Sequence, residues 1–229
     1  MPYHSGVGGV EKIFMACCGK TFCRGCSLAE SKEMRKGSMK PWCSFCRIPL
    51  SNLDKECVER YKRRTSIDDA DAFYHLGYAY FQGKWGLRQN HMKAIELWKR
   101  GAELGSCNAN AYLGYVYLDG RGVEKDIDRG IHYNKLAAIG GHEIARHILG
   151  LLEKKNGNKD TAMKHCMIAA RCGYDKALKL VGTGYKDGYV TKDEYANTLR
   201  AHKECQDRMK SAQRVEAAHR RGKGQGRLN

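Results

Sequence analysis

Residues 109–126 read ANAYLGYVYLDGRGVEKD, and this stretch decides the fold because its pattern recurs on both sides of it. Three Leu-Gly pairs share the same place in this pattern, at residues 76–77, 113–114 and 149–150, and they begin 37 and 36 residues apart. An alanine precedes each leucine by four residues, at Ala72, Ala109 and Ala145. Self-similarity at this period is typical of a solenoid built from stacked repeats.

The repeated residues predict two helices in each unit. Alanine and leucine four residues apart share one helical face, and the small alanine lets a neighbouring helix approach closely. A first helix is therefore expected over residues 71–82. Glycines at 83 and 86 then indicate a turn, and a second helix is expected over residues 91–104. Because one pair cannot bury its apolar face alone, residues 70–173 should form three antiparallel pairs that stack in order.

The pattern resembles the Sel-one-like repeat, a relative of the tetratricopeptide repeat. The second unit carries the fullest set of matching residues: Ala109, Leu113, Gly114, Tyr117, Gly120, Gly122, Val123, Asp126 and Ala138. The first unit has Leu87 and Asn90 where the family has valine and aspartate, and the third has a shorter loop at residues 154–158. The resemblance implies an all-α fold, an α-α solenoid that binds protein partners and is not a catalyst.

The composition of the chain indicates where the protein resides and which partners its charge would suit. The 229 residues carry a formal net charge of +16, which suits acidic proteins, nucleic acid or anionic membranes without choosing between them. No apolar run approaches the roughly 18 residues of a membrane span, and the N-terminus lacks the apolar core of a signal peptide. We therefore expect a cytoplasmic or nuclear protein whose 11 cysteines are reduced thiols or metal ligands. No Ser/His/Asp array and no phosphate-binding loop is readable, so no catalytic residue is predicted.

The N-terminal segment carries the metal-binding chemistry. Two Cys-x-x-Cys pairs, Cys23 with Cys26 and Cys43 with Cys46, are separated by 16 residues, and Cys17 and Cys18 precede the first pair. A Cys-x-x-Cys pair can turn back on itself and offer two thiolates to one tetrahedral zinc ion. The alternative is a small thiol-rich helical hairpin that holds no metal.

Two parts of this segment resemble a RING finger. The run from Cys18 to Cys26 (CGKTFCRGC) is similar to the centre of a RING, and residues 43–50 (CSFCRIPL) are similar to its end. The resemblance implies two zinc sites in a cross-brace, but the opening Cys-x-x-Cys is absent and Lys20 stands where the family has histidine. A truncated or degenerate RING is therefore expected, with about one zinc ion per chain held by Cys18, Cys43 and Cys46. Cys17 is a possible fourth ligand, whereas Cys23 and Cys26 would serve the depleted site.

The RING resemblance also suggests an enzymatic alternative. Arg47 follows the final ligand, where many RING ligases carry the basic residue that contacts ubiquitin; the other interpretation is a plain surface arginine. In the ligase hypothesis, the repeats choose the substrate and a ubiquitin-conjugating enzyme is a partner. The missing ligand pair argues against it. A basic nucleic-acid binder is a second alternative, which the lack of RNA-stacking motifs disfavours.

The chain divides into five predicted parts. Residues 1–50 form the zinc finger, 51–69 a charged connector that is a solvated helix or linker, and 70–190 the solenoid. Thr191 and Glu194 form a capping box that opens a C-terminal capping helix over residues 191–219. Residues 220–229 are a basic tail with the composition of a disordered segment.

The main functional prediction is a protein-interaction adaptor. Phe73, Asn110 and Arg146 follow the repeated alanines and differ from unit to unit, so the repeat pattern leaves them free to bind a partner on the concave face. Phe73 and Arg146 are also residue types that are suited to anchor an interface.

Overall fold

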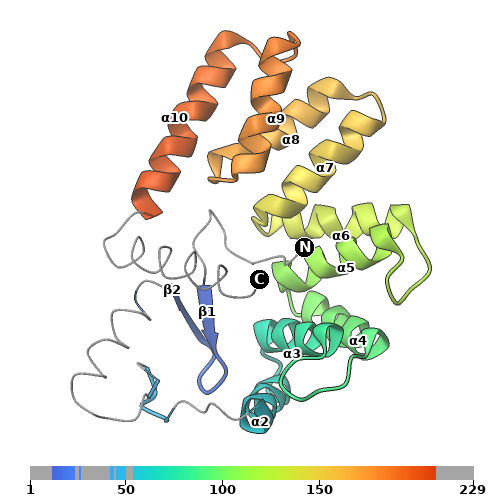
Figure 1. The fold of residues 1–229 in the computed structure, drawn as a ribbon, viewed down its shortest axis with the longest axis vertical. Helices are drawn as coiled ribbons and strands as arrows, with labels where there is room; N and C mark the ends of the chain where they lie inside the picture. Colours follow the sequence, from blue (N-terminus) through green and yellow to red (C-terminus); the bar gives the residue numbers. More distant parts are fainter. Residues whose placement is uncertain (1–11, 24–25, 27–41, 44, 50–53, 210–229) are drawn as a thin grey trace, which may run out of the picture.

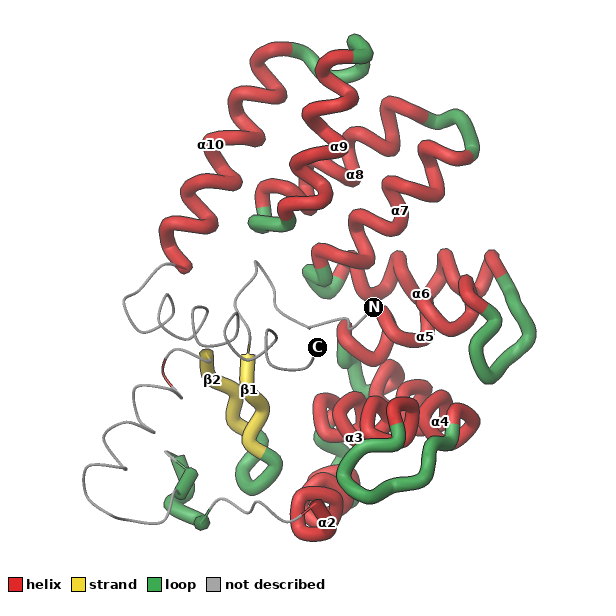
Figure 2. The backbone as a smooth tube through the Cα atoms, in the orientation of Figure 1, coloured by secondary structure: helices red, strands yellow, loops and turns green. Residues whose placement is uncertain are grey.

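The computed structural model describes residues 12–23, 26, 42–43, 45–49 and 54–209, and most of them form an arc of stacked helices (Figure 1). Three helix pairs follow one another: α3 (Ala70–Gln82) with α4 (His91–Glu103), α5 (Cys107–Asp119) with α6 (Ile127–Ile139), and α7 (Glu143–Lys155) with α8 (Lys159–Arg171). Each helix packs on the next one in sequence from α3 to α9 (Asp175–Lys186). Figure 2 shows each pair folding back on itself through a loop or turn. The predicted all-α solenoid of three antiparallel pairs is confirmed.

Side-chain caps and glycine turns fix where the repeat helices begin and end. Asp69 Oδ1 accepts a hydrogen bond from the backbone N–H of Ala72 at 3.2 Å, and so starts α3. Gly83 and Gly120 end α3 and α5 in the left-handed conformation, with φ of 66° and 75°. Only glycine adopts this conformation without strain, so the glycine turns stop the first helices at equivalent places in the first two units.

The glycine of each Leu-Gly pair lies where the two helices of a unit approach most closely. A Cβ atom on Gly77 would lie 2.6 Å from Nε1 of Trp98 in α4, and Gly150 is similarly close to Cys166 in α8. Gly114 faces Asn134 of α6 in the same way. The recurring Leu-Gly pair is therefore a packing signal, since any side chain at these positions would force the helices apart.

Residues 54–65 form a packed helix rather than a solvated connector. Helix α2 (Asp54–Thr65) buries Val58 and Tyr61, which join a core cluster with Ala72 and Leu76 of α3. Of the two predicted forms, a helix or a linker, the helix is present, but it is not solvated on every side, because a largely charged helix still presents one apolar stripe to the first repeat.

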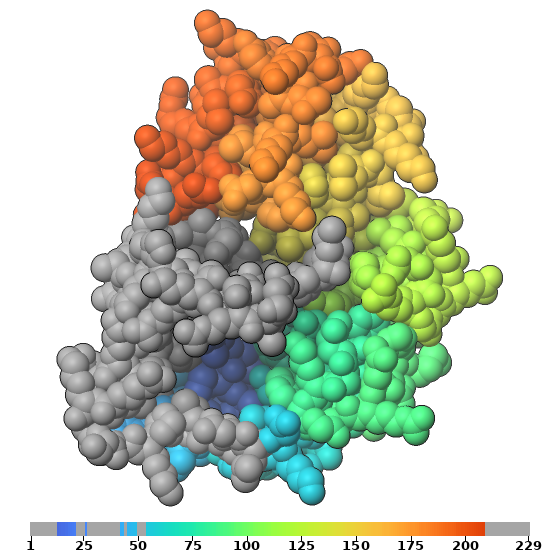
Figure 3. Space-filling view, in the orientation of Figure 1, coloured from blue at the N-terminus to red at the C-terminus, as the bar shows by residue number. Residues whose placement is uncertain are grey.

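A two-stranded hairpin completes this end of the solenoid. Strand β1 (Lys12–Met15) pairs antiparallel with β2 (Lys20–Cys23), so that Phe14 lies opposite Thr21. Phe14 is buried in the same cluster as Tyr61 and Ala72. In Figure 3 the hairpin surface, in dark blue, adjoins the surface of the first repeat. Residues 12–23 are thus a β-hairpin and not the helical hairpin considered as an alternative.

The other end is covered by α10 (Lys192–Met209), which packs on α8 and α9. The predicted capping box is confirmed: the N–H of Thr191 donates to Glu194 Oε2 at 2.9 Å, and the N–H of Glu194 donates to Thr191 Oγ1 at 3.2 Å. His202 is 6% exposed and contacts the carbonyl oxygen of Ala170 through Nδ1 at 2.8 Å. The predicted extension of this helix to residue 219 and the tail over 220–229 lie outside the described residues. No helix in the described part of the chain combines the length and the apolar character needed to cross a membrane.

Candidate metal centre

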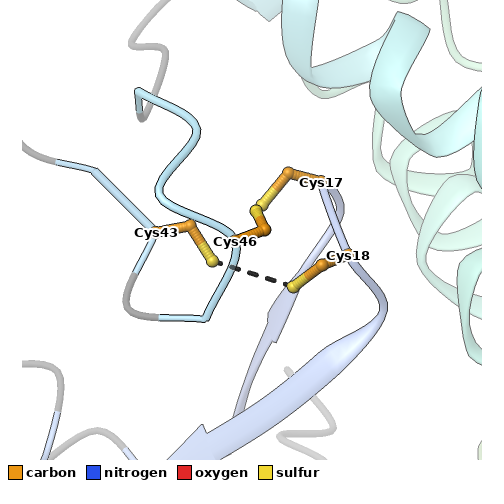
Figure 4. Close-up of side chains that lie close together, drawn as sticks. All are labelled: Cys17, Cys18, Cys43 and Cys46. Atoms are coloured by element: carbon orange, nitrogen blue, oxygen red, sulfur yellow. Dashed lines mark hydrogen bonds between the residues drawn. The ribbon is translucent and has the colours of Figure 1, made fainter.

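Four cysteine side chains converge beside the hairpin. The sulfur atoms of Cys17, Cys18, Cys43 and Cys46 all lie within 4.8 Å of one another. Figure 4 shows that two of them come from the hairpin turn and two from the loop that contains residues 42–49. The expected ligands Cys18, Cys43 and Cys46 are thus brought together, and Cys17 lies beside them. This cluster of four thiols could hold a metal ion.

The spacing and chemistry of the donors fit a tetrahedral soft metal. The Sγ atoms of Cys18 and Cys43 are 3.7 Å apart. Tetrahedral zinc with Zn–S bonds of about 2.3 Å places its sulfur ligands roughly 3.8 Å from one another. All four residues are free thiols rather than disulfides. A set of four thiolates is one of the common ligand sets of structural zinc sites, so the residues present fit this group.

Backbone geometry builds the half of the site around Cys43. The N–H of Cys43 donates to the carbonyl of Ile48 at 2.8 Å, and the N–H of Arg47 donates back to the carbonyl of Cys43 at 2.9 Å. Arg47 takes a left-handed φ of 60° to close this turn. A bridge between Trp42 and Pro49 brings the two ends of the loop together. The turn therefore directs Cys43 and Cys46 toward the same point.

The hairpin turn builds the other half. The N–H groups of Cys18 and Gly19 both donate to the carbonyl of Met15, at 3.1 and 2.8 Å. Gly19 has a φ of 71°, a conformation that favours glycine. This tight turn is what lets the adjacent Cys17 and Cys18 reach one site.

The thiols affect one another's ionisation. Burial alone would raise the pKa of Cys43, but the backbone N–H groups of Cys46 and Phe45 stabilise its thiolate and lower the pKa to about 7. Burial raises the pKa of Cys17 above its ordinary value, and the hydrogen bonds to Cys43 and Cys46 raise it further. Burial likewise raises the pKa of Cys18, although the N–H of Lys20 acts in the opposite direction. One thiol thus ionises readily while its neighbours resist, and a divalent cation would remove that resistance by neutralising the accumulated charge.

The remaining predicted ligands lie apart from this cluster or outside the described residues. The side chain of Cys26 is exposed, and it is not part of the four-thiol cluster. Cys23 ends β2, where its backbone pairs with Lys12, and its side chain lies outside the described residues. Lys20 is exposed, and its backbone N–H contacts the thiol of Cys18. Arg47 is also exposed, with its guanidinium 6.0 Å from the ring centre of Trp42. Its role in contacting ubiquitin stays a prediction.

The three predicted partner-binding residues differ in how much surface they offer. Phe73 is half-buried near Gly101, at the junction of α3, α4 and α5. Arg146 is half-buried as well, and its Nη2 donates to the carbonyl of Ala138 at 3.0 Å, which ties α7 to the end of α6. Asn110 is only 6% exposed. The assumption that a position free of the repeat pattern faces outward was therefore wrong for Asn110.

Sequence reasoning missed the residues that dock the cysteine segment onto the solenoid. Phe14 packs between Tyr61 and His75, and the guanidinium of Arg60 donates to the carbonyl of Pro49 at 2.8 Å. The apolar stretch Ile13–Met15 was the signal for the first contact. The contact of Arg60 with Pro49 had no signal in the sequence, because a buried arginine in a charged helix cannot be told apart by sequence from the exposed charged residues around it.

Comparison with known proteins supports the repeat interpretation. Residues 70–106 and 107–142 match the Sel1 repeat family model. A solved Sel1 repeat protein from Oxalobacter formigenes is 26% identical with a TM-score of 0.56, over 65% of this chain and 64% of that chain. The c5321 protein, a protective antigen of uropathogenic Escherichia coli strains with an SLR fold, is 29% identical with a TM-score of 0.57, over 66% of this chain and 33% of that chain. None of the curated proteins compared with the sequence matches it.

The matches place Sel1 repeats in the first two helix pairs, and α7 and α8 continue the same stack beyond them. This chain spans less than two thirds of the length of either solved structure. The protein is therefore an α-α solenoid whose first two helix pairs match the Sel1 repeat, with a cluster of four cysteines at its N-terminal end.

Proposed function

We propose that this chain is a protein-interaction scaffold whose N-terminal segment is organised by one structural zinc ion. Four sulfur atoms within 4.8 Å of one another, on a segment packed against Sel1 repeats, carry the proposal. Cys17, Cys18, Cys43 and Cys46 would fill all four positions of a tetrahedral ion. Such a site has no open position for substrate or water, so its role is structural rather than catalytic.

The partner would bind along the first helices of the repeats. Helix α3 contacts α5 and α5 contacts α7, so these helices line the same side of the stack. Phe73 and Arg146, at equivalent positions of α3 and α7, remain partly exposed, whereas the equivalent Asn110 of α5 is buried. An aromatic ring and a guanidinium are the groups that most often anchor a protein interface.

Metal analysis of the purified full chain tests the zinc site. We expect about one zinc per chain, because four thiolates complete one tetrahedral site. Cys43→Ser should lose the metal, whereas Cys205→Ser, in α10, should retain it. Replacement by cobalt should give the visible absorption bands of a tetrahedral thiolate complex. A wild-type chain that takes up neither zinc nor cobalt would contradict the proposal.

A binding experiment tests the scaffold. A bound protein should be recovered with the wild type and lost with the double variant Phe73→Ala, Arg146→Ala, at a cost of about 1–4 kcal/mol. Arg146 also donates a hydrogen bond to the carbonyl of Ala138, so its loss could disturb the fold. Circular dichroism must therefore show that the double variant has the helix content of the wild type. Deletion of residues 210–229 should matter little. Capture that survives the double substitution, falls steeply with salt and disappears with the deletion would instead indicate a nucleic-acid binder.

A further inference from the structure

Helix α2 contacts both halves of the four-cysteine cluster. On one side, Arg60 is 9% exposed, and its Nη2 donates to the carbonyl of Pro49 at 2.8 Å while also pairing with Glu56. Pro49 ends the loop that carries Cys43 and Cys46, and it bridges to Trp42 at the start of that loop. The buried guanidinium therefore fixes the loop to the helix.

One turn further along α2, Arg64 lies against the turn of the hairpin. Its Nε donates to Asp69 Oδ2 at 2.8 Å, and Asp69 is also the cap of α3. This ion pair lies directly against Gly19, where a Cβ atom would collide with the guanidinium and come within 2.8 Å of the carboxylate. Gly19 follows Cys18 in the chain. The second half of the cluster is thus seated on the junction between α2 and the first repeat.

Aromatic packing strengthens the same contact. The ring of Phe14 in β1 lies 5.9 Å from that of Tyr61 and 4.9 Å from that of His75 in α3. Tyr61 in turn stacks on Trp85, with centroids 4.9 Å apart and planes at 8°. The hairpin is consequently anchored through α2 to the loop of the first repeat as well as to α3.

We propose that Arg60 and Arg64 are positioning residues for the metal centre, and that metal binding is thermodynamically coupled to the docking of the cysteine segment on the first repeat. The inference rests on the proposed zinc site. Cys18 and Cys43 are 25 residues apart, so a metal ion must bring together two separate segments. A helix that already holds both segments reduces the entropy lost when the ion closes the site. By linkage, the ion stabilises the docked first repeat by the same coupling free energy.

Zinc affinity of the full chain, measured by competition with a chromophoric chelator, tests the role of Arg60. Arg60→Met should weaken zinc binding by about tenfold or more, the range seen when residues that support metal ligands are removed. Arg60→Lys keeps a charge beside Glu56 and one donor for Pro49, so it should recover part of the loss. Arg63→Met is the matched control, because Arg63 is exposed on the same helix. Its zinc affinity should equal that of the wild type.

Hydrogen exchange separates positioning from plain destabilisation. In the wild type, zinc should slow amide exchange in α3 relative to the metal-free chain. In Arg60→Met this zinc-dependent protection should shrink, whereas a merely structural loss would raise exchange equally with and without zinc. If the wild type binds no zinc, the proposed site itself is wrong. If the wild type binds zinc and Arg60→Met matches Arg63→Met in affinity and in zinc-dependent protection, the site stands and the coupling is refuted.

Discussion

Gly77→Ala tests whether the close approach of α3 and α4 sets the architecture of the first repeat. The added Cβ would lie 2.6 Å from Nε1 and 2.7 Å from Cδ1 of Trp98, and 3.1 Å from the carbonyl oxygen of Ala94. Trp98 cannot easily move aside, since it is fully buried and its Nε1 donates to the carbonyl of Tyr74 at 3.1 Å. The alanine must therefore displace the indole or push the two helices apart.

Three contributions give the size of the effect. Overpacking a tight core costs roughly 1–3 kcal/mol. Loss of the indole hydrogen bond costs about 1 kcal/mol, and the higher helix propensity of alanine offsets about 1 kcal/mol. Gly77→Ala should thus lower the free energy of unfolding by about 1–3 kcal/mol, which lowers the melting temperature by roughly 2–4 °C per kcal/mol in a protein of this size.

Urea unfolding followed by far-ultraviolet circular dichroism measures this loss, and Gly182→Ala is the matched control. Gly182 is also inside a helix, but its nearest neighbour, the hydroxyl of Tyr195, would lie 3.4 Å from the new Cβ. That substitution should be neutral or stabilising by up to about 1 kcal/mol. Trp98→Phe should relieve part of the penalty of Gly77→Ala in a double-mutant cycle. Equal stability of Gly77→Ala and Gly182→Ala would refute the packing argument.

Two further predictions concern buried histidines. Burial lowers the pKa of His142 from 6.5 to about 4. Between these two pH values the unfolded chain therefore binds a proton at His142 that the folded chain does not bind. The free energy of unfolding should be highest above pH 6.5 and should fall as the pH drops toward 4. Urea midpoints of the metal-free chain at pH 7 and 5 should show this decline. The variant His142→Asn keeps an acceptor for the N–H of Ala145 and should make the decline smaller. A decline of the same size in the variant would contradict the assignment of the pH dependence to His142. His202→Ala removes the contact with Ala170 and should cost roughly 1–3 kcal/mol, with faster amide exchange in α10, while the exposed Lys203→Ala should change neither. Unaltered exchange in α10 would show that His202 does not hold this helix.

The fold was predictable because its signals are local and repeated. The Ala–Leu spacing fixed one face of each first helix, and the glycine turns marked the ends, so the expected boundaries of α3 and α4 agree with the observed ones to within a residue. The partner that each repeated glycine meets was not predictable. Trp98, Asn134 and Cys166 face the three glycines, and such different side chains share no pattern that a sequence alone could reveal.

The cysteine cluster was predictable in part, and its support was not. The cysteine spacing and the RING resemblance identified Cys18, Cys43 and Cys46. The position of Cys17 depends on a hairpin turn, and two adjacent cysteines in the sequence do not predict such a turn. The buried face of α2 could not be predicted from the sequence either. Val58 and Tyr61 stand among charged residues, and they become core only because Phe14 and the first repeat cover them.

The position of the cysteine cluster is related to how the ends of the solenoid are covered. A stack of helix pairs presents an apolar surface at each end, which must be covered. Helix α10 covers one end, and α2 with the hairpin covers Ala72 and Leu76 at the other. A two-stranded hairpin is only marginally stable by itself in water, and here its packing on α2 and α3 stabilises it. If the proposed zinc site forms, four thiolates that close on one metal ion would add further stability to this end of the solenoid, because the cluster lies on the segments that cover the first repeat.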